Sequence, residues 1–139
     1  MIEDPKEKYF RKYPNILGCY TPATHSIWVN WAGIKKERPD EWIRYGAGIC
    51  AHELTHMFNH LRGQSPTSCS ANELYYDELL AFKVGNAVMR LLGIVPTWDV
   101  EDGVIACFTI AISKHKRKAG ISGAVKLRSG RGRYARRAV

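Results

Sequence analysis

The sequence lacks any long apolar run and any apolar stretch near its start. Its longest apolar run, residues 104–112, is too short to cross a bilayer. The first residues, which include Glu3 and Asp4, do not resemble a secretory signal. We therefore expect a cytoplasmic protein with no membrane span, and 139 residues suit one domain with a sizeable core.

Cysteine pairs with metal-binding or redox spacing are also missing. The four cysteines are widely scattered and form no C-x-x-C pair, which argues against a zinc ribbon and against a redox motif. We expect them to be reduced thiols that mostly fill the core. They are Cys19, Cys50, Cys69 and Cys107.

Acidic residues are absent from residues 114–137, a stretch that contains ten Lys or Arg. The other eleven basic residues and all 13 acidic residues precede it, so the body has a balance of −2 although the whole chain has a net charge of +8. Residues 119–139 are rich in Gly, Ser and Arg, which predicts a flexible basic tail able to bind nucleic acid. We expect residues 1–118 to form the folded domain.

The hydrophobic pattern of the body predicts an α+β domain that is mostly helical. Apolar residues at 27, 29 and 31 alternate with their neighbours, so residues 25–31 and the preceding segment 16–20 are expected to form a hairpin or small meander. Small residues at 46–48 indicate close packing of the next helix against this sheet. Start and stop signals predict helices over residues 4–13, 38–62, 70–92 and from about 97–99 to 116.

The second of the expected helical segments, residues 38–62, contains an H-E-x-x-H motif at residues 52–56. Helical geometry puts His52 and His56 one turn apart on one face, where both imidazoles can bind one metal ion. Glu53 stands beside the open side of such an ion and can act as a general base for the attacking water. This spacing is typical of zinc metalloproteases.

A catalytic zinc usually needs a third protein ligand. The metzincin pattern would require Gly and His where the sequence has Asn59 and Arg62, which excludes that class. The helix over residues 70–92 offers three carboxylates instead. Glu78 is favoured, because it is a mid-helix acid among apolar residues and the small residues that follow permit close helix packing. The alternatives are Glu73, which also fits a capping box with Ser70, and Asp77, which can instead support a ligand together with Tyr76.

The motif with His60 four residues later, followed by Glu78-Leu79-Leu80-Ala81, resembles the minimal gluzincin peptidases of the ImmA/IrrE-like group. Residues 18–22 and 27–30 resemble the small sheet ahead of their motif helix, and the likeness covers about residues 16–93. It implies a small zincin-like domain, a Zn²⁺ cofactor and an edge strand that binds an extended peptide or protein substrate. The chain differs in Phe82, where related families often have Asp.

Two functions are therefore compared. The first is a zinc-dependent peptidase that uses a metal-activated water with Glu53 as base. The second is a nucleic-acid-associated or virion-type protein with a structural zinc and a basic binding tail, but a structural site needs no general base beside it. Three residues are candidates to stabilise the oxyanion, and His60 is expected to support the site or to lie at the surface. The oxyanion candidates are Tyr75, Tyr76 and His115.

Overall fold

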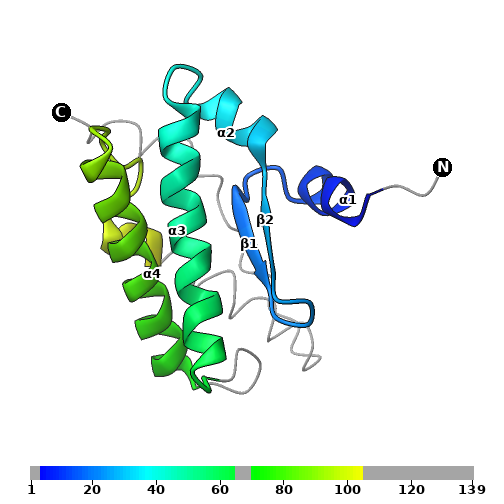
Figure 1. Cartoon of the computed structure of the whole chain (residues 1–139), viewed down its shortest axis with the longest axis vertical. Coiled ribbons are helices and arrows are strands. Elements are labelled where there is room, and N and C mark those ends of the chain that lie inside the picture. The colour runs from blue at the N-terminus through cyan, green and yellow to red at the C-terminus, as the bar shows by residue number, and fades with distance from the viewer. Residues whose placement is uncertain (1–3, 65–69, 105–139) are drawn as a thin grey trace, which may run out of the picture.

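The computed structural model describes residues 4–64 and 70–104. These residues form a small, mostly helical α+β fold with one two-stranded antiparallel sheet, which confirms the predicted class (Figure 1). No described helix is long and apolar enough to span a membrane. The elements in chain order are α1 (Pro5–Lys12), β1 (Gly18–Thr21), β2 (Ser26–Val29), α2 (Trp31–Glu37), α3 (Trp42–Leu61) and α4 (Ala71–Leu91).

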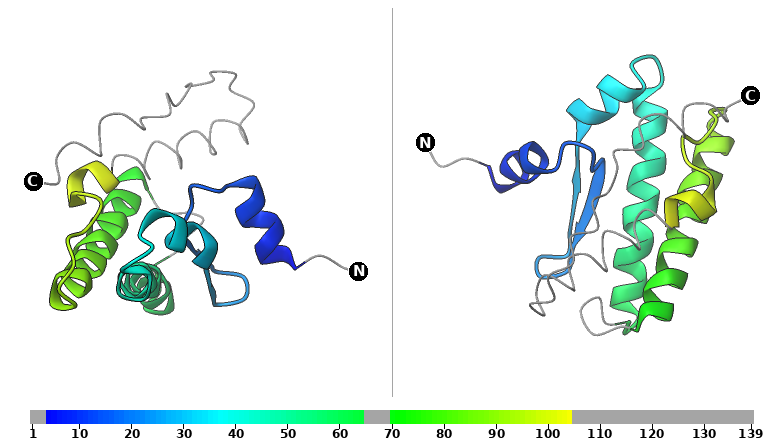
Figure 2. Two further views of the ribbon diagram at one scale, coloured as in Figure 1. Left: turned by 90° about the horizontal axis from the view of Figure 1, so that it is seen from above. Right: turned by 180° about the vertical axis from the view of Figure 1, so that it is seen from behind.

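Helix α3 lies between α4 on one side and the β1–β2 hairpin on the other, and α1 lies beyond the hairpin (Figure 1). Figure 2 gives the same arrangement from two further directions. The strands pair in the register Gly18↔Val29 to Thr21↔Ser26. The predicted packing of the hairpin on the motif helix is confirmed, since both strands contact α3.

The chain before α3 differs from the prediction. Trp31 does not extend the strand but begins α2, because the Asn30 side chain accepts a hydrogen bond from the Gly33 N–H at 2.9 Å and caps a new helix. Arg38 ends α2, so the motif helix starts at Trp42 and not at residues 38–40.

The contact between α3 and α4 depends on two glycines. A Cβ atom on Gly85 would lie 2.9 Å from the carbonyl oxygen of Gly48, and one on Gly48 would lie 2.4 Å from the Met89 side chain. A Cβ on Gly46 would meet Trp31 of α2. The small residues ahead of the motif therefore pack against α4 and α2, which corrects the expectation that they face the sheet. The small residues of α4 do bring the two helices together, as predicted.

The core lies at the end of α3 that precedes the motif. Buried side chains from α2, α3 and the end of α4 meet there, and partly buried residues of the hairpin and α3 pack around them. This cluster fixes the hairpin against α3 and so places β1 beside the motif. Its buried members are Ile34, Tyr45, Met89 and Ile94, surrounded by Leu17, Val29, Trp42 and Ile49.

Two predicted helix starts are confirmed, and the end of the chain is described only in part. Asp4 caps α1 through the Lys6 N–H, and Ser70 and Glu73 form the complete capping box of α4. After α4 the chain turns helical again at residues 100–104. The remainder of that predicted helix, the basic tail, the domain boundary at 118, Cys69 and Cys107 lie outside the described residues.

Candidate metal centre

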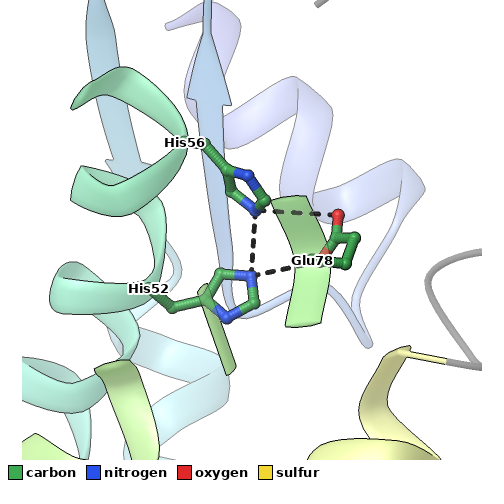
Figure 3. Close-up of side chains that lie close together, drawn as sticks. All are labelled: His52, His56 and Glu78. Carbon is green, nitrogen blue, oxygen red and sulfur yellow. Dashed lines mark hydrogen bonds and ion pairs between the residues drawn. The ribbon is translucent and has the colours of Figure 1, made fainter. Parts of the chain in front are cut away.

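His52 and His56 place their imidazoles together on α3, as the motif spacing predicts. Their Nε2 atoms are 3.1 Å apart, and the ring planes are nearly perpendicular at 75°. Both rings are turned toward α4, where they meet the Glu78 carboxylate (Figure 3). Two nitrogen donors on α3 therefore face the same carboxylate on α4.

Glu78 completes the group from α4. Its Oε2 lies 3.5 Å from His52 Nε2 and its Oε1 lies 3.6 Å from His56 Nε2. Donors of a tetrahedral ion with bonds of about 2.0–2.1 Å lie about 3.3–3.4 Å apart, so each carboxylate oxygen is near the distance expected from one of the histidines. Within residues 4–64 and 70–104, these are the residues whose donor atoms gather within 4.8 Å as a possible metal group. His52, His56 and Glu78 could therefore hold a metal ion.

The Glu78 carboxylate also has the electrostatics of a ligand. Its Oε2 is fully buried and, among the described residues, accepts no hydrogen bond. Burial raises the pKa of this carboxyl, but the two imidazoles outweigh it and lower the pKa to about 2. A buried anionic oxygen without a donor is costly unless a cation neutralises it, so the residues fit a bound metal.

Asp77 supports the site by orienting His56. Its Oδ2 lies 2.6 Å from His56 Nδ1, and its Oδ1 accepts a hydrogen bond from the Asn59 amide at 2.5 Å. An Nδ1–H that donates to Asp77 leaves the Nε2 lone pair free to bind a metal. Asp77 is thus the supporting residue that the sequence offered as an alternative role, whereas Tyr76 is 66 % exposed. Asn59 was missed, although its spacing of three residues from His56 puts it on the same helix face.

A metal ion would have to compete with a proton for His56. Burial lowers the pKa of His56, but the Asp77 and Glu78 carboxylates outweigh it and raise the pKa to about 10. The pKa of Asp77 is lowered, because His56 and Asn59 outweigh the effect of its burial. In the metal-free protein a protonated His56 therefore supplies the positive charge between the two carboxylates.

Glu53 lies beside this group but faces the hairpin. Only 8 % of the residue is exposed, and the nearby Tyr20 backbone N–H acts to lower the pKa of its carboxyl. A Cβ on Gly18 would lie 2.8 Å from Glu53 Oε1, so β1 can approach this closely only with glycine there. Burial raises the pKa of Glu53, and the two histidines oppose this only in part.

Phe82 fills the position where the resemblance would suggest Asp. Its ring packs edge-on against His52, with the ring centroids 4.5 Å apart. A Cβ on Gly103 would lie 2.5 Å from the Phe82 ring, so the turn at residues 100–104 holds that ring from behind. Phe82 therefore fixes the His52 ring by packing, where an Asp would do so by a hydrogen bond.

The other sequence candidates lie apart from the metal group. Glu73 is the exposed capping residue of α4, which leaves Glu78 as the carboxylate brought to both histidines. Tyr75 packs against Tyr76 at the surface, and His115 is outside the described residues. His60 hydrogen-bonds Tyr20 in the hairpin.

The centre has been compared with known proteins at three levels. No protein-family model, curated protein sequence or solved structure matches this chain.

Proposed function

We propose that the protein is a zinc-dependent peptidase of the H-E-x-x-H gluzincin type. The observation that carries the proposal is the group of two imidazoles and one carboxylate, whose nearest donor atoms are 3.1–3.6 Å apart, with a buried glutamate that directly follows the first of these histidines in the sequence. Two imidazoles and one carboxylate are a ligand set that favours zinc and leaves a fourth position for water or substrate.

Zinc in such a centre supplies Lewis acidity, which polarises a carbonyl group and lowers the pKa of a water to about 7. His52, His56 and Glu78 would hold it. Asp77 would keep His56 in the tautomer that binds, and Phe82 would keep the His52 ring in place. These two contacts fix both rings before any ion arrives, which favours tight binding.

Glu53 would accept the proton of the attacking water and return it to the leaving amine. A general base works best when its pKa lies near the working pH, and burial moves the pKa of Glu53 upward from its ordinary acidic value in that direction. A purely structural metal site would have no use for such a group.

The outer edge of β1 would bind the substrate backbone. Leu17 accepts a hydrogen bond from Asn30 N–H, so antiparallel alternation turns the backbone groups of Gly18 and Tyr20 away from β2. The Tyr20 N–H faces Glu53, so the backbone groups of Gly18 and the Tyr20 carbonyl would be the ones available to a substrate. An extended peptide added at this edge would run past the metal centre, which makes a peptide or protein the substrate class.

The test is Glu53→Gln, which keeps the side-chain shape but cannot accept the proton. We expect full zinc content by elemental analysis and a loss of about 10²–10⁴-fold in cleavage rate. Cleavage is read by mass spectrometry on a peptide library made from a digested cell proteome. Glu7→Gln, an exposed glutamate on α1, is the matched control and should cleave like the wild type.

Two results would count against the peptidase. One is equal cleavage by Glu53→Gln and wild type at equal zinc content. The other is a zinc-loaded wild type that cleaves no peptide in the library. The second result would favour the alternative function, in which zinc is structural and the basic residues 119–139 bind nucleic acid.

A further inference from the structure

A second cluster of metal-binding side chains lies where the hairpin turn meets the end of α3. The Tyr20 hydroxyl oxygen is 3.1 Å from His25 Nδ1 and 2.6 Å from His60 Nδ1. The two imidazole rings have their centroids 5.4 Å apart. The three side chains come from β1, from the turn between the strands and from the last turn of α3. Three elements thus bring two nitrogen donors to one phenol oxygen.

Hydrogen bonding satisfies this cluster but does not by itself explain the backbone conformation of His25. A tyrosine hydroxyl has one proton, so it can donate to one of the two Nδ1 atoms and must accept from the other. His25 also has a φ of +49°, a left-handed conformation, and it is the one non-glycine residue of the described chain with positive φ. Glycine would adopt this turn conformation without strain. A strained histidine aimed at a second histidine points to a use for both rings.

We propose that Tyr20, His25 and His60 form a second metal site, which binds a divalent transition-metal ion of the Cu²⁺ and Zn²⁺ class. Imidazole nitrogens suit these ions, and among the divalent first-row metals Cu²⁺ binds such donors most tightly. On binding, the Tyr20 hydroxyl loses its proton to solvent and its oxygen bonds the ion, while each histidine binds through a neutral Nδ1. His25 is exposed and the other two residues are half-buried, so an ion can enter from solvent.

This site shares no donor with the first centre. His60 lies one helical turn beyond His56 on α3, and its own partners are in the hairpin. An ion bound there would cross-link the hairpin turn to the end of α3 and so hold β1 at a fixed distance from the motif helix. The proposal does not rest on peptidase activity, because metal binding is its only claim.

The experiment titrates Cu²⁺ into full-length protein that already contains one equivalent of Zn²⁺. Calorimetry counts the bound copper, absorption spectroscopy detects a phenolate-to-copper charge-transfer band, and elemental analysis follows the zinc. We expect one equivalent of Cu²⁺ with that band and with zinc retained. Tyr20→Phe should lose the band, and His60→Ala should weaken binding by about 100-fold or more, beyond the usual cost of losing a supporting residue.

Tyr76→Phe is the matched control, because Tyr76 lies on α4 and is 66 % exposed. It should keep both the stoichiometry and the band. Circular dichroism and a thermal melt establish that each variant is folded. If His60→Ala does not fold, Tyr20→Phe alone tests the proposal. The proposal is overturned by a band that persists in Tyr20→Phe, by equal affinity in folded His60→Ala, or by copper that enters only as zinc leaves.

Discussion

Replacing Asp77 by Asn tests the proposed role of this residue in metal binding. The carboxylate accepts hydrogen bonds from both His56 Nδ1 at 2.6 Å and Asn59 Nδ2 at 2.5 Å. An asparagine side chain has the same shape but only one acceptor oxygen, so its NH₂ group would face one of these two donors. The variant therefore loses one hydrogen bond of the chain that orients His56 while the packing is kept.

The effect should depend on pH, because His56 is protonated in the metal-free protein. Burial lowers its pKa, but Asp77 and Glu78 outweigh this and raise it to about 10, so metal binding must expel a proton throughout the range below that pH. Wild-type affinity should then rise by about tenfold per pH unit between pH 6 and 9. Asp77→Asn removes one of the carboxylates that raise the pKa of His56, so its affinity should rise less steeply.

At pH 9 a proton competes least for His56, so the loss of the hydrogen bond to Asp77 should have the largest effect on the affinity for Zn²⁺. We expect Asp77→Asn to bind Zn²⁺ about 10–100-fold more weakly than wild type there, and the two curves to converge toward pH 6. Competition with a chromophoric chelator at each pH measures both affinities, with the exposed Asp40→Asn as control. Parallel curves, or equal affinities at pH 9, would refute the role of Asp77.

Three further predictions concern other parts of the chain. Glu78→Ala should lose zinc by elemental analysis, whereas Glu73→Ala should keep it, and the reverse result would move the third ligand to Glu73. Gly85→Ala should lower the free energy of unfolding by about 1–3 kcal/mol in a denaturant titration, since its Cβ would lie 2.9 Å from the Gly48 carbonyl oxygen. An unchanged midpoint would mean that α3 and α4 can move apart at no cost in stability. Removing residues 119–139 should abolish most salt-sensitive binding to DNA while leaving zinc content intact, and binding that survives would place the contact on the body.

The metal group could be predicted because its chemistry is encoded in local spacing. His52 and His56 are one helical turn apart, and the helix over residues 70–92 is regular enough to show which carboxylates it carries. Glu78 could be preferred over Glu73 because Ser70 already gives Glu73 a capping role, and the structure has that capping box. Asp77 could be named as a partner but not assigned, because its orientation toward His56 depends on how the two helices pack.

Features that depend on tertiary contacts were harder to predict. Helix α2 was missed because Asn30 continues a strand pattern in the sequence, and only its side-chain cap on Gly33 shows that a helix begins. The glycines before the motif were assigned to the wrong neighbour, since small residues indicate close packing but not the partner. The pairing of His60 with Tyr20 joins residues 40 positions apart and leaves no periodic signal.

The close approach of α3 and α4 at Gly48 and Gly85 has a consequence for which ions the centre accepts. Two donors of the metal group come from α3 and one from α4, so the spacing between the helices sets the size of the triangle that the donors form. A Cβ at position 85 would also lie 3.2 Å from the Cβ of His52, directly beside a ligand. Any side chain larger than hydrogen there would push the helices apart and favour ions of larger radius. If this group binds a metal, the backbone contact at two glycines would help to set the ionic radius that fits best.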